Sequence, residues 1–291
     1  MTEVEFDAPL QECPLCGERS LTAFDRDFRG HSLSKCRSCG TKLVNPQFSD
    51  AHLRRFYASY ISHDVPLGLD EGAPLAHHLR PHVRLTAKRR ALTLLASFIR
   101  PGRILMVGCG DGMELEVARA AGWQPEGYDV DPITTARVAA RVGVPVHCGD
   151  FSNLGERGRF DVLFMDQVIE HPKDPARYLR AADELLRPGG LLYLATPNIG
   201  SLGNRYKTSL DKLGVRGARR GKHYNTKHHL FFFTPQVLAK LLRGRFGFEV
   251  LVVRASLKPQ LNPVTALFGR WFPVLDSSFI LVARKPGPAK S

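Results

Sequence analysis

Four of the six cysteines form two pairs that have the spacing of a metal site. Each pair is Cys-x-x-Cys followed directly by glycine, and residues 17–35 separate the pairs. Two residues between thiolates let one tight turn direct both sulfurs at the same ion, and Gly17 and Gly40 permit such a turn. The pattern predicts a structural four-thiolate zinc site, with an iron–sulfur cluster as the lesser alternative. The expected ligands are Cys13, Cys16, Cys36 and Cys39.

A second candidate site is a glycine loop that follows a short apolar run at residues 104–107. Gly108, Gly110 and Gly112 form this loop, and residues 113–121 have the composition of a helix. Backbone amides in such a strand–loop–helix unit can approach a ligand closely. The spacing differs from the Gly-x-Gly-x-x-Gly of dinucleotide enzymes, and no Lys-Ser/Thr pair follows, as a phosphate loop requires. NAD and ATP are therefore disfavoured.

Two acids stand at the ends of the next two expected strands. Asp129 ends the strand expected at residues 126–129, where a carboxylate can accept hydrogen bonds from both hydroxyls of a ribose. Asp150 and Phe151 follow the strand expected at residues 144–147, and they suit the amino group and the ring face of an adenine. Solvated turn residues are the alternative, but an acid at each of two successive strand ends favours a binding site.

Alternating strands and helices are expected to position these residues. Strands joined to helices by short loops predict an α/β fold with a doubly wound, mostly parallel, seven-stranded sheet that carries helices on both faces. Its ligands belong at the carboxyl ends of the strands. The remaining strands are expected at residues 160–165, 191–195, 248–253 and 279–283, and the helices at 113–121, 132–141, 175–186 and 235–242, the last with Thr234 as its N-cap.

The chain divides into three expected segments. A zinc ribbon covers residues 1–48, a helical linker or cap covers 49–100, and the main domain covers 101–291 with an acceptor-side insertion at 197–233. Within the linker, helices are expected at residues 50–60, with Asp50 as N-cap, and at 77–100. Residues 64–74 are rich in glycine, proline and acids and are interpreted as a loop or lid.

Composition and charge limit the class of protein. The chain has 291 residues, of which 43% are hydrophobic, and a formal net charge of +13, which favours an anionic partner. No run of apolar residues is long enough to span a membrane and the first residues are acidic, so we expect a cytoplasmic protein without a transmembrane segment. Residues 201–230 hold eight Lys or Arg and the single acid Asp211. This insertion is interpreted as a cap for an anionic acceptor or phosphate backbone, or alternatively as a solvated basic face.

Residues 103–195 resemble class I S-adenosylmethionine-dependent methyltransferases, with several motifs in the order of that family. Residues 160–172 (FDVLFMDQVIEHP) and 187–190 (RPGG) are similar to the small-molecule members, which include the ubiquinone-pathway O-methyltransferases. The resemblance implies S-adenosylmethionine as cofactor. One departure is Met106, which stands where many relatives have an acid. Backbone carbonyls or Asp166 would therefore bind the amino group of the cofactor.

The same resemblance implies a role for each residue of the candidate cofactor site. The methionine part of the cofactor would lie over Gly108, Gly110 and Gly112. Asp129 would bind the ribose, and Asp150 with Phe151 would contact the adenine.

Methyl transfer to a hydroxyl requires alignment of the acceptor with the methyl group and removal of a proton. His171 follows Glu170 in the loop expected to face the acceptor, and is the leading candidate for the general base. A structural hydrogen bond is its alternative role. His229 in the insertion is a further candidate for acceptor contact, and the sequence supplies no convincing ligand set for a metal among the histidines near it.

We therefore expect methyl transfer to a small-molecule, sugar or lipid-like acceptor, at oxygen. The first alternative is an RNA methyltransferase that uses the ribbon and the basic insertion for RNA binding. Residues 160–168 lack the Asn/Asp-Pro-Pro-aromatic element of amino-directed nucleic-acid methylases and the Pro-Cys of cytosine-C5 enzymes, which excludes only those two chemistries. The second alternative is a non-catalytic scaffold that binds S-adenosylmethionine or zinc.

Overall fold

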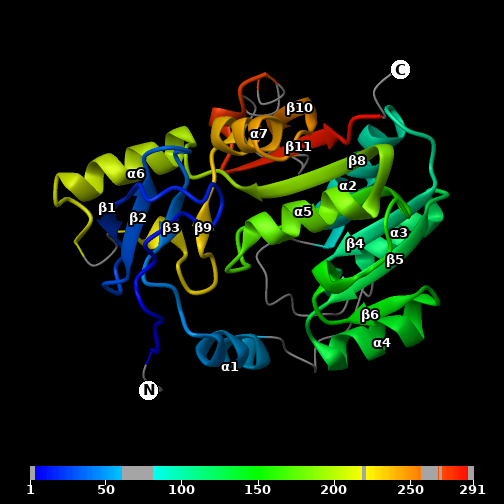
Figure 1. Cartoon of the computed structure of the whole chain (residues 1–291), viewed down its shortest axis with the longest axis horizontal. Helices are drawn as coiled ribbons and strands as arrows, with labels where there is room; N and C mark the ends of the chain where they lie inside the picture. The colour runs from blue at the N-terminus through cyan, green and yellow to red at the C-terminus, as the bar shows by residue number, and fades with distance from the viewer. Residues whose placement is uncertain (1–3, 61–80, 218–220, 257–267, 269–270, 288–291) are drawn as a thin grey trace.

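A computed structural model describes residues 4–60, 81–217, 221–256, 268 and 271–287 of the chain (Figure 1). The loop or lid expected at residues 64–74 lies outside these residues. The helix expected at residues 77–100 corresponds to α2 (Pro81–Ala96). Residues 77–80 of the expected range likewise lie outside the described residues. Within the described part, no helix is both long enough and apolar enough to span a membrane.

The larger sheet has seven strands and confirms the predicted fold class. All neighbouring strands from β8 to β6 are parallel, whereas β11 runs antiparallel to both β8 and β10. In spatial order the strands are β10 (Glu249–Ala255), β11 (Ser278–Arg284), β8 (Leu186–Pro197), β7 (Phe160–Asp166), β4 (Arg103–Val107), β5 (Gln124–Asp129) and β6 (Val146–Cys148). The chain order reverses at β4, so a ligand site is expected at the carboxyl ends of β4 and its neighbours.

Helices cover both faces of this sheet because alternate strand residues point to opposite sides. In β4, Leu105 and Val107 belong to the core cluster that also contains residues of α5 (Pro175–Leu185) and α7 (Pro235–Gly244). Ile104 and Met106 pack on the opposite face with α2, α3 (Met113–Ala120) and α4 (Pro132–Val142).

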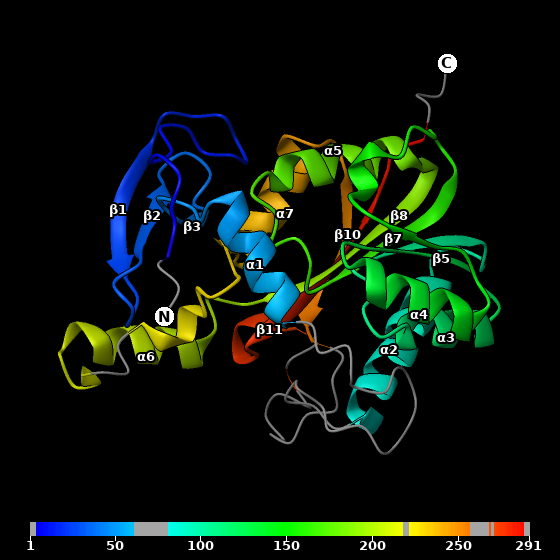
Figure 2. The same cartoon turned by 90° about the horizontal axis from the view of Figure 1, so that it is seen from below.

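The smaller sheet joins the N-terminal segment to the insertion. Its order is β1 (Leu21–Arg26), β2 (Ser32–Cys36), β3 (Lys42–Val44) and β9 (Phe231–Phe232), with all neighbours antiparallel. In both views α6 (Leu202–Lys212) lies beside this sheet (Figures 1 and 2), and in Figure 2 α1 (Asp50–Tyr60) lies between it and the larger sheet. Hydrogen bonds therefore link segments that are far apart in the sequence, and the predicted division into segments stays a prediction.

Two local expectations need correction. Ser49, and not Asp50, caps α1, because its hydroxyl accepts a hydrogen bond from the amide of His52 at 3.0 Å and its carbonyl accepts one from Leu53. The expected strand at residues 191–195 begins earlier, since β8 already pairs with Phe160 at Leu186 before its register shifts. The predicted cap of α7 is confirmed, with the Thr234 hydroxyl accepting from the amide of Val237.

Candidate functional site

The glycine loop after β4 is closely packed at Gly108 and Gly112 and has free space at Gly110. A Cβ at Gly108 would stand 2.7 Å from Cγ2 of Val168, and one at Gly112 would stand 2.6 Å from Cγ1 of Val138. A Cβ at Gly110 would meet no atom closer than 3.9 Å. All three glycines have positive φ, which side chains other than glycine adopt at a cost. This loop therefore offers space over Gly110, as the close approach of a cofactor requires.

The carboxylate of Asp129 is fixed against that loop. Its Oδ2 accepts a hydrogen bond from the amide of Gly110 at 2.9 Å, and its Oδ1 accepts one from the amide of Asp131 at 3.2 Å. Burial raises the pKa of Asp129 above its ordinary value. The structure thus brings the predicted ribose-binding acid and the predicted glycine loop together at the carboxyl ends of β4 and β5.

The two predicted adenine contacts, Asp150 and Phe151, differ in their exposure to solvent. Asp150 is partly exposed and caps the short helix η1 (Phe151–Asn153), with its Oδ1 accepting from the amide and hydroxyl of Ser152. Phe151 is only 1% exposed, and its ring packs edge-on against Tyr178 at a centroid distance of 4.8 Å. The ring of Phe151 belongs to the core and presents no face to a ligand. The sequence does not distinguish a ligand-facing ring from a core ring, because an aromatic side chain after a strand end can point toward the ligand site or into the core.

A buried charge cluster lies beside the glycine loop and was missed by the sequence analysis. Lys88 of α2 is paired with Glu114 at the start of α3 and with Asp166 at the end of β7, the latter at 2.5 Å. Although burial disfavours its ammonium, the two acids raise the pKa of Lys88 above its ordinary value. Arg84, one turn earlier, pairs with Asp111 at 2.7 Å. Asp166, the acid predicted for the amino group of the cofactor, is therefore already engaged by a cation.

Nothing in the sequence around Lys88 and Arg84 identifies this role. Their spacing on a basic helix is equally typical of a solvated face. Only the packing of α2 against α3 brings the two cations to acids that are distant in the sequence.

Three imidazoles converge where the loop after β7 meets the insertion. Nitrogens of His171, His228 and His229 all lie within 4.8 Å of one another, and we refer to these three residues as the imidazole cluster. The Nδ1 of His171 is 3.0 Å from the carbonyl oxygen of His228 and 3.4 Å from the hydroxyl of Tyr57 in α1. Burial lowers the pKa of His171 to about 4, and it also holds the pKa of His229 well below its ordinary range. These two imidazoles are therefore neutral near pH 7.

Backbone hydrogen bonds hold the imidazole cluster together. The carbonyl of Glu170 accepts from the amides of Leu230 and Phe231, at 2.9 and 3.1 Å. The carboxylate of the same residue accepts from the hydroxyl of Thr196 at 2.9 Å. The amide of His171 donates to the carbonyl of Val168, the residue that packs over Gly108. The cluster is thus tied to the edge of the glycine loop by a single turn of chain.

The four cysteines of the two pairs lie together in the N-terminal segment. Sγ of Cys13 is 3.7 Å from that of Cys39, and Sγ of Cys16 is 3.5 Å from that of Cys36. Tetrahedral zinc with Zn–S bonds of about 2.3 Å places its sulfurs about 3.8 Å apart, so this donor set fits zinc. Gly17 and Gly40, which were expected to permit the two tight turns, both have positive φ.

The single acid of the basic insertion is internal. The side chain of Asp211 is 1% exposed and accepts hydrogen bonds from Arg216 at 3.1 Å and from the amide of Gly221 at 2.9 Å. His223 is within 3.6 Å of it. Arg205, Lys207 and Lys212 of α6 are exposed, so the surface of α6 is basic and the binding of an anion there stays a prediction.

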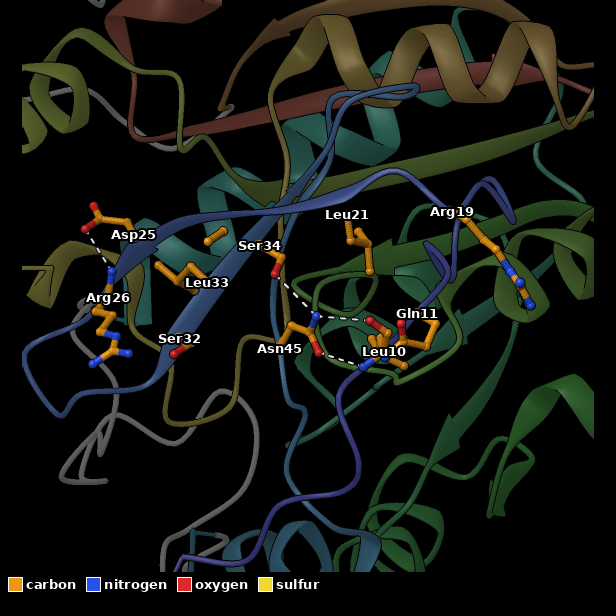
Figure 3. Close-up of a pocket in the computed structure, with 11 residues that line it drawn as sticks. Leu10, Gln11, Arg19, Leu21, Asp25, Arg26, Ser32, Leu33, Ser34 and Asn45 are labelled. Carbon is orange, nitrogen blue, oxygen red and sulfur yellow. Dashed lines mark hydrogen bonds between the residues drawn. The ribbon is translucent and has the colours of Figure 1, made fainter.

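A hollow of about 570 Å³ lies in the N-terminal segment (Figure 3). It is formed between residues 10–11 and strands β1 and β2, and Asn45 bridges its wall by hydrogen bonds with Leu10 and Ser34. None of the predicted cofactor, metal or acceptor residues lines it.

Comparisons with known proteins agree with this arrangement. A family model described as a methyltransferase domain matches residues 75–253. In the solved structures, the 1,6-didemethyltoxoflavin-N1-methyltransferase of Burkholderia thailandensis, which holds S-adenosylhomocysteine, is similar with a TM-score of 0.54 and 20% identity. That likeness covers 92% of this chain and 99% of the other, and it shows the fold alone.

Two curated relatives are ubiquinone biosynthesis O-methyltransferases. The protein of Cereibacter sphaeroides is 34% identical over 149 residues, which is 48% of this chain and 58% of the relative. That of Caulobacter vibrioides is 29% identical over 177 residues, which is 58% of this chain and 65% of the relative. The matched part thus spans less than two thirds of either relative. Because the family match covers more than half of the chain, the chain belongs to the methyltransferase family, within the class I S-adenosylmethionine-dependent enzymes.

Proposed function

We propose that this methyltransferase transfers the methyl group of S-adenosylmethionine to a hydroxyl oxygen of a small-molecule acceptor. The observation that carries the proposal is the imidazole cluster after the carboxyl end of β7, one turn of chain from the glycine loop, in which burial lowers the pKa of His171 and His229. The similarity to O-methyltransferases over 149 residues supports oxygen as the accepting atom.

The residues present suit the cofactor. We propose that Gly108, Gly110 and Gly112 lie beneath its methionine part, where the space over Gly110 is open. Asp129 is proposed for the ribose hydroxyls, and Asp150 for the adenine, with the backbone at Phe151 in place of its buried ring. Asp166 is proposed to receive the amino group of the cofactor, and Lys88, which is paired with it, the carboxylate group. When bound, the cofactor supplies an electrophilic methyl carbon on a positively charged sulfur.

The proposed role of His171 is to accept the proton of the acceptor. Its Nδ1 lies against a carbonyl oxygen, which can only accept, so Nδ1 carries the hydrogen and Nε2 carries the lone pair. As the hydroxyl oxygen bonds to the methyl carbon, the carbon–sulfur bond breaks with its electron pair moving to sulfur, and the hydroxyl proton moves to Nε2. A base whose pKa is about 4 favours an acidic hydroxyl, such as that of a phenol, over an alkyl alcohol.

We also propose that the four cysteines hold a structural Zn²⁺. Their sulfur separations fit the ion, and four protein thiolates leave no position open for a reactant. Zinc there would stabilise a segment whose three strands are short.

Transfer of labelled methyl from S-adenosylmethionine into a host lysate tests the proposed function. The lysate is depleted of this activity, incubated with the protein, and separated into RNA, protein, lipid and small-molecule fractions. We expect the label in the small-molecule fraction, in a bond that resists mild base as an ether does. Label in RNA or protein, or in no fraction, would overturn the proposal. The Asp129→Ala variant, with its fold checked by circular dichroism, is the control because it lacks the carboxylate beside the glycine loop.

A further inference from the structure

The imidazole cluster contains three histidines, and the proposed base chemistry uses only one of them, His171. One histidine follows β7, and two adjacent histidines precede β9, so the three rings come from two segments. The rings of His171 and His228 are nearly parallel with centroids 5.1 Å apart, and His229 stands edge-on to both.

The hydrogen bonding of His171 is the kind that a metal ligand makes. Metal-binding histidines commonly donate their other ring N–H to a backbone carbonyl, which fixes the ring and leaves one lone pair for the ion. His171 does this toward the carbonyl of His228 at 3.0 Å. Its Nε2 is 4.0 Å from Oε1 of Glu170, a buried carboxylate that favours a nearby cation.

We propose that His171, His228 and His229 together bind one divalent transition-metal ion, and that the acceptor oxygen takes an open position on it. Three imidazoles suit zinc, iron, nickel and copper better than magnesium or calcium, which prefer oxygen ligands. A site with three protein ligands leaves room for a reactant, unlike the four-thiolate site. Nitrogens bound at about 2.1 Å to a tetrahedral ion stand about 3.4 Å apart, so the rings close by up to about 1.4 Å on binding.

This inference deepens the proposed function and rests on it for the identity of the bound reactant. An ion at this place lowers the pKa of a coordinated hydroxyl, so the acceptor reaches the methyl group as its oxyanion. The proton then leaves to solvent. His171 would be a ligand in the metal-bound protein, and the base proposed above in the metal-free protein. The bond that forms is still oxygen to methyl carbon, and the bond that breaks is still carbon to sulfur.

Cobalt titration of the full chain tests the proposal without any measurement of turnover. The four-thiolate site is first filled with zinc, and Co²⁺ is then added while bound metal and the visible spectrum are recorded. We expect a second metal ion per chain, with the ligand-field bands of nitrogen and oxygen ligands and no thiolate charge-transfer band. The His229→Gln and His228→Gln variants should each weaken Co²⁺ binding at least about tenfold. The matched control is His82→Gln, at an exposed histidine of α2, which should bind as the parent does.

Two results would overturn the proposal: no second ion in the parent protein, or equal Co²⁺ affinity in the cluster variants and the control. The first needs no variant, so it stands even where a substitution impairs folding. Failure of the metal proposal can be distinguished from failure of the proposed function. If the protein binds a second ion but methylates no hydroxyl, the metal site is supported and the proposed function is wrong. Conversely, methylation by protein that binds no second ion would return His171 to the role of base.

Discussion

At the scale of single residues, the candidate cofactor site is held together by a hydrogen bond from the glycine loop to Asp129 and by the ion pairs of Lys88 with Glu114 and Asp166. Asp129 and Gly110 were both predicted, and one hydrogen bond of 2.9 Å joins them. Lys88 and Glu114 were not predicted, because an ion pair between distant elements leaves no periodic signal. Phe151 was predicted as a ring contact and is a core residue instead. Motif spacing predicts which backbone segments meet, but not which side chains turn inward.

Gly110→Ala separates the cofactor role of the loop from backbone strain. Gly110 has φ +47 and faces open space, so alanine adds about 1 kcal/mol of strain and a methyl group where the cofactor is proposed to lie. We expect S-adenosylmethionine affinity, measured by calorimetry, to fall at least about tenfold, equal to about 1.4 kcal/mol.

The matched control is Gly122→Ala, at a glycine with φ +82 and no atom within 4 Å, in the turn after α3. It should lose similar stability and keep its affinity. Equal affinity in both variants would remove the glycine loop from the cofactor site.

His223 predicts an acid-sensitive step in stability. Burial lowers its pKa from the model-peptide value of 6.5 to about 4. Between these values the unfolded chain binds a proton that the folded chain does not, so stability present above pH 6.5 is lost as the pH falls to about 4. We expect a loss of up to about 3 kcal/mol from this residue, and a smaller loss in His223→Gln, in urea unfolding across that range. A His223→Gln profile parallel to the parent's would show that the buried imidazole is not responsible.

At the scale of elements, long periodic segments were predictable and short paired ones were not. The apolar runs of β4 and β7 and the N-cap of α7 depend on neighbours in the sequence, and the structure confirms them. The two-residue β9 exists only because β3 pairs with it, at Lys42 with Phe232 and Leu43 with Phe231. No local pattern could reveal that pairing, or the imidazole cluster that it holds in place.

The corrected cap of α1 provides a test at this scale. Ser49→Ala removes the hydroxyl that accepts from the amide of His52, and helix caps of this kind contribute about 1 kcal/mol. Asp50→Asn keeps that cap, and it changes only an exposed ion pair with Lys173. We expect a loss of about 1 kcal/mol in the first variant and less than about 0.5 kcal/mol in the second, measured by denaturant unfolding. A larger loss in Asp50→Asn would restore Asp50 as the cap.

At the scale of the whole molecule, the cysteine site and the acceptor side are mechanically joined. The core that contains Cys13, Cys36 and Cys39 also contains Phe231 and Phe233 of the insertion. The amide of Val44, the last residue of β3, donates to the carbonyl of Leu230, whose own amide donates to Glu170. The N-terminal segment therefore supports the imidazole cluster through hydrogen bonds and packing, whatever further contacts it makes.

Disruption of the cysteine site should consequently reduce methyl transfer as well as stability. In Cys39→Ser the proposed zinc site loses a ligand, and a displacement of the imidazole cluster by about 1 Å can lower turnover up to about 100-fold. The Cys148→Ser variant is the control, since Cys148 is exposed and lies on β6. Full turnover by metal-depleted Cys39→Ser protein would show that the two sites are independent.

The most direct test of the central claim is the identity of the atom that receives the methyl group. The protein is given S-adenosylmethionine with a ¹³C-labelled methyl and the acceptor fraction that took up label, and the product is examined by NMR. We predict a methyl carbon with the chemical shift and coupling pattern of an oxygen-bound methyl group. A labelled methyl bound to nitrogen or carbon would contradict the assignment of this chain as an O-methyltransferase.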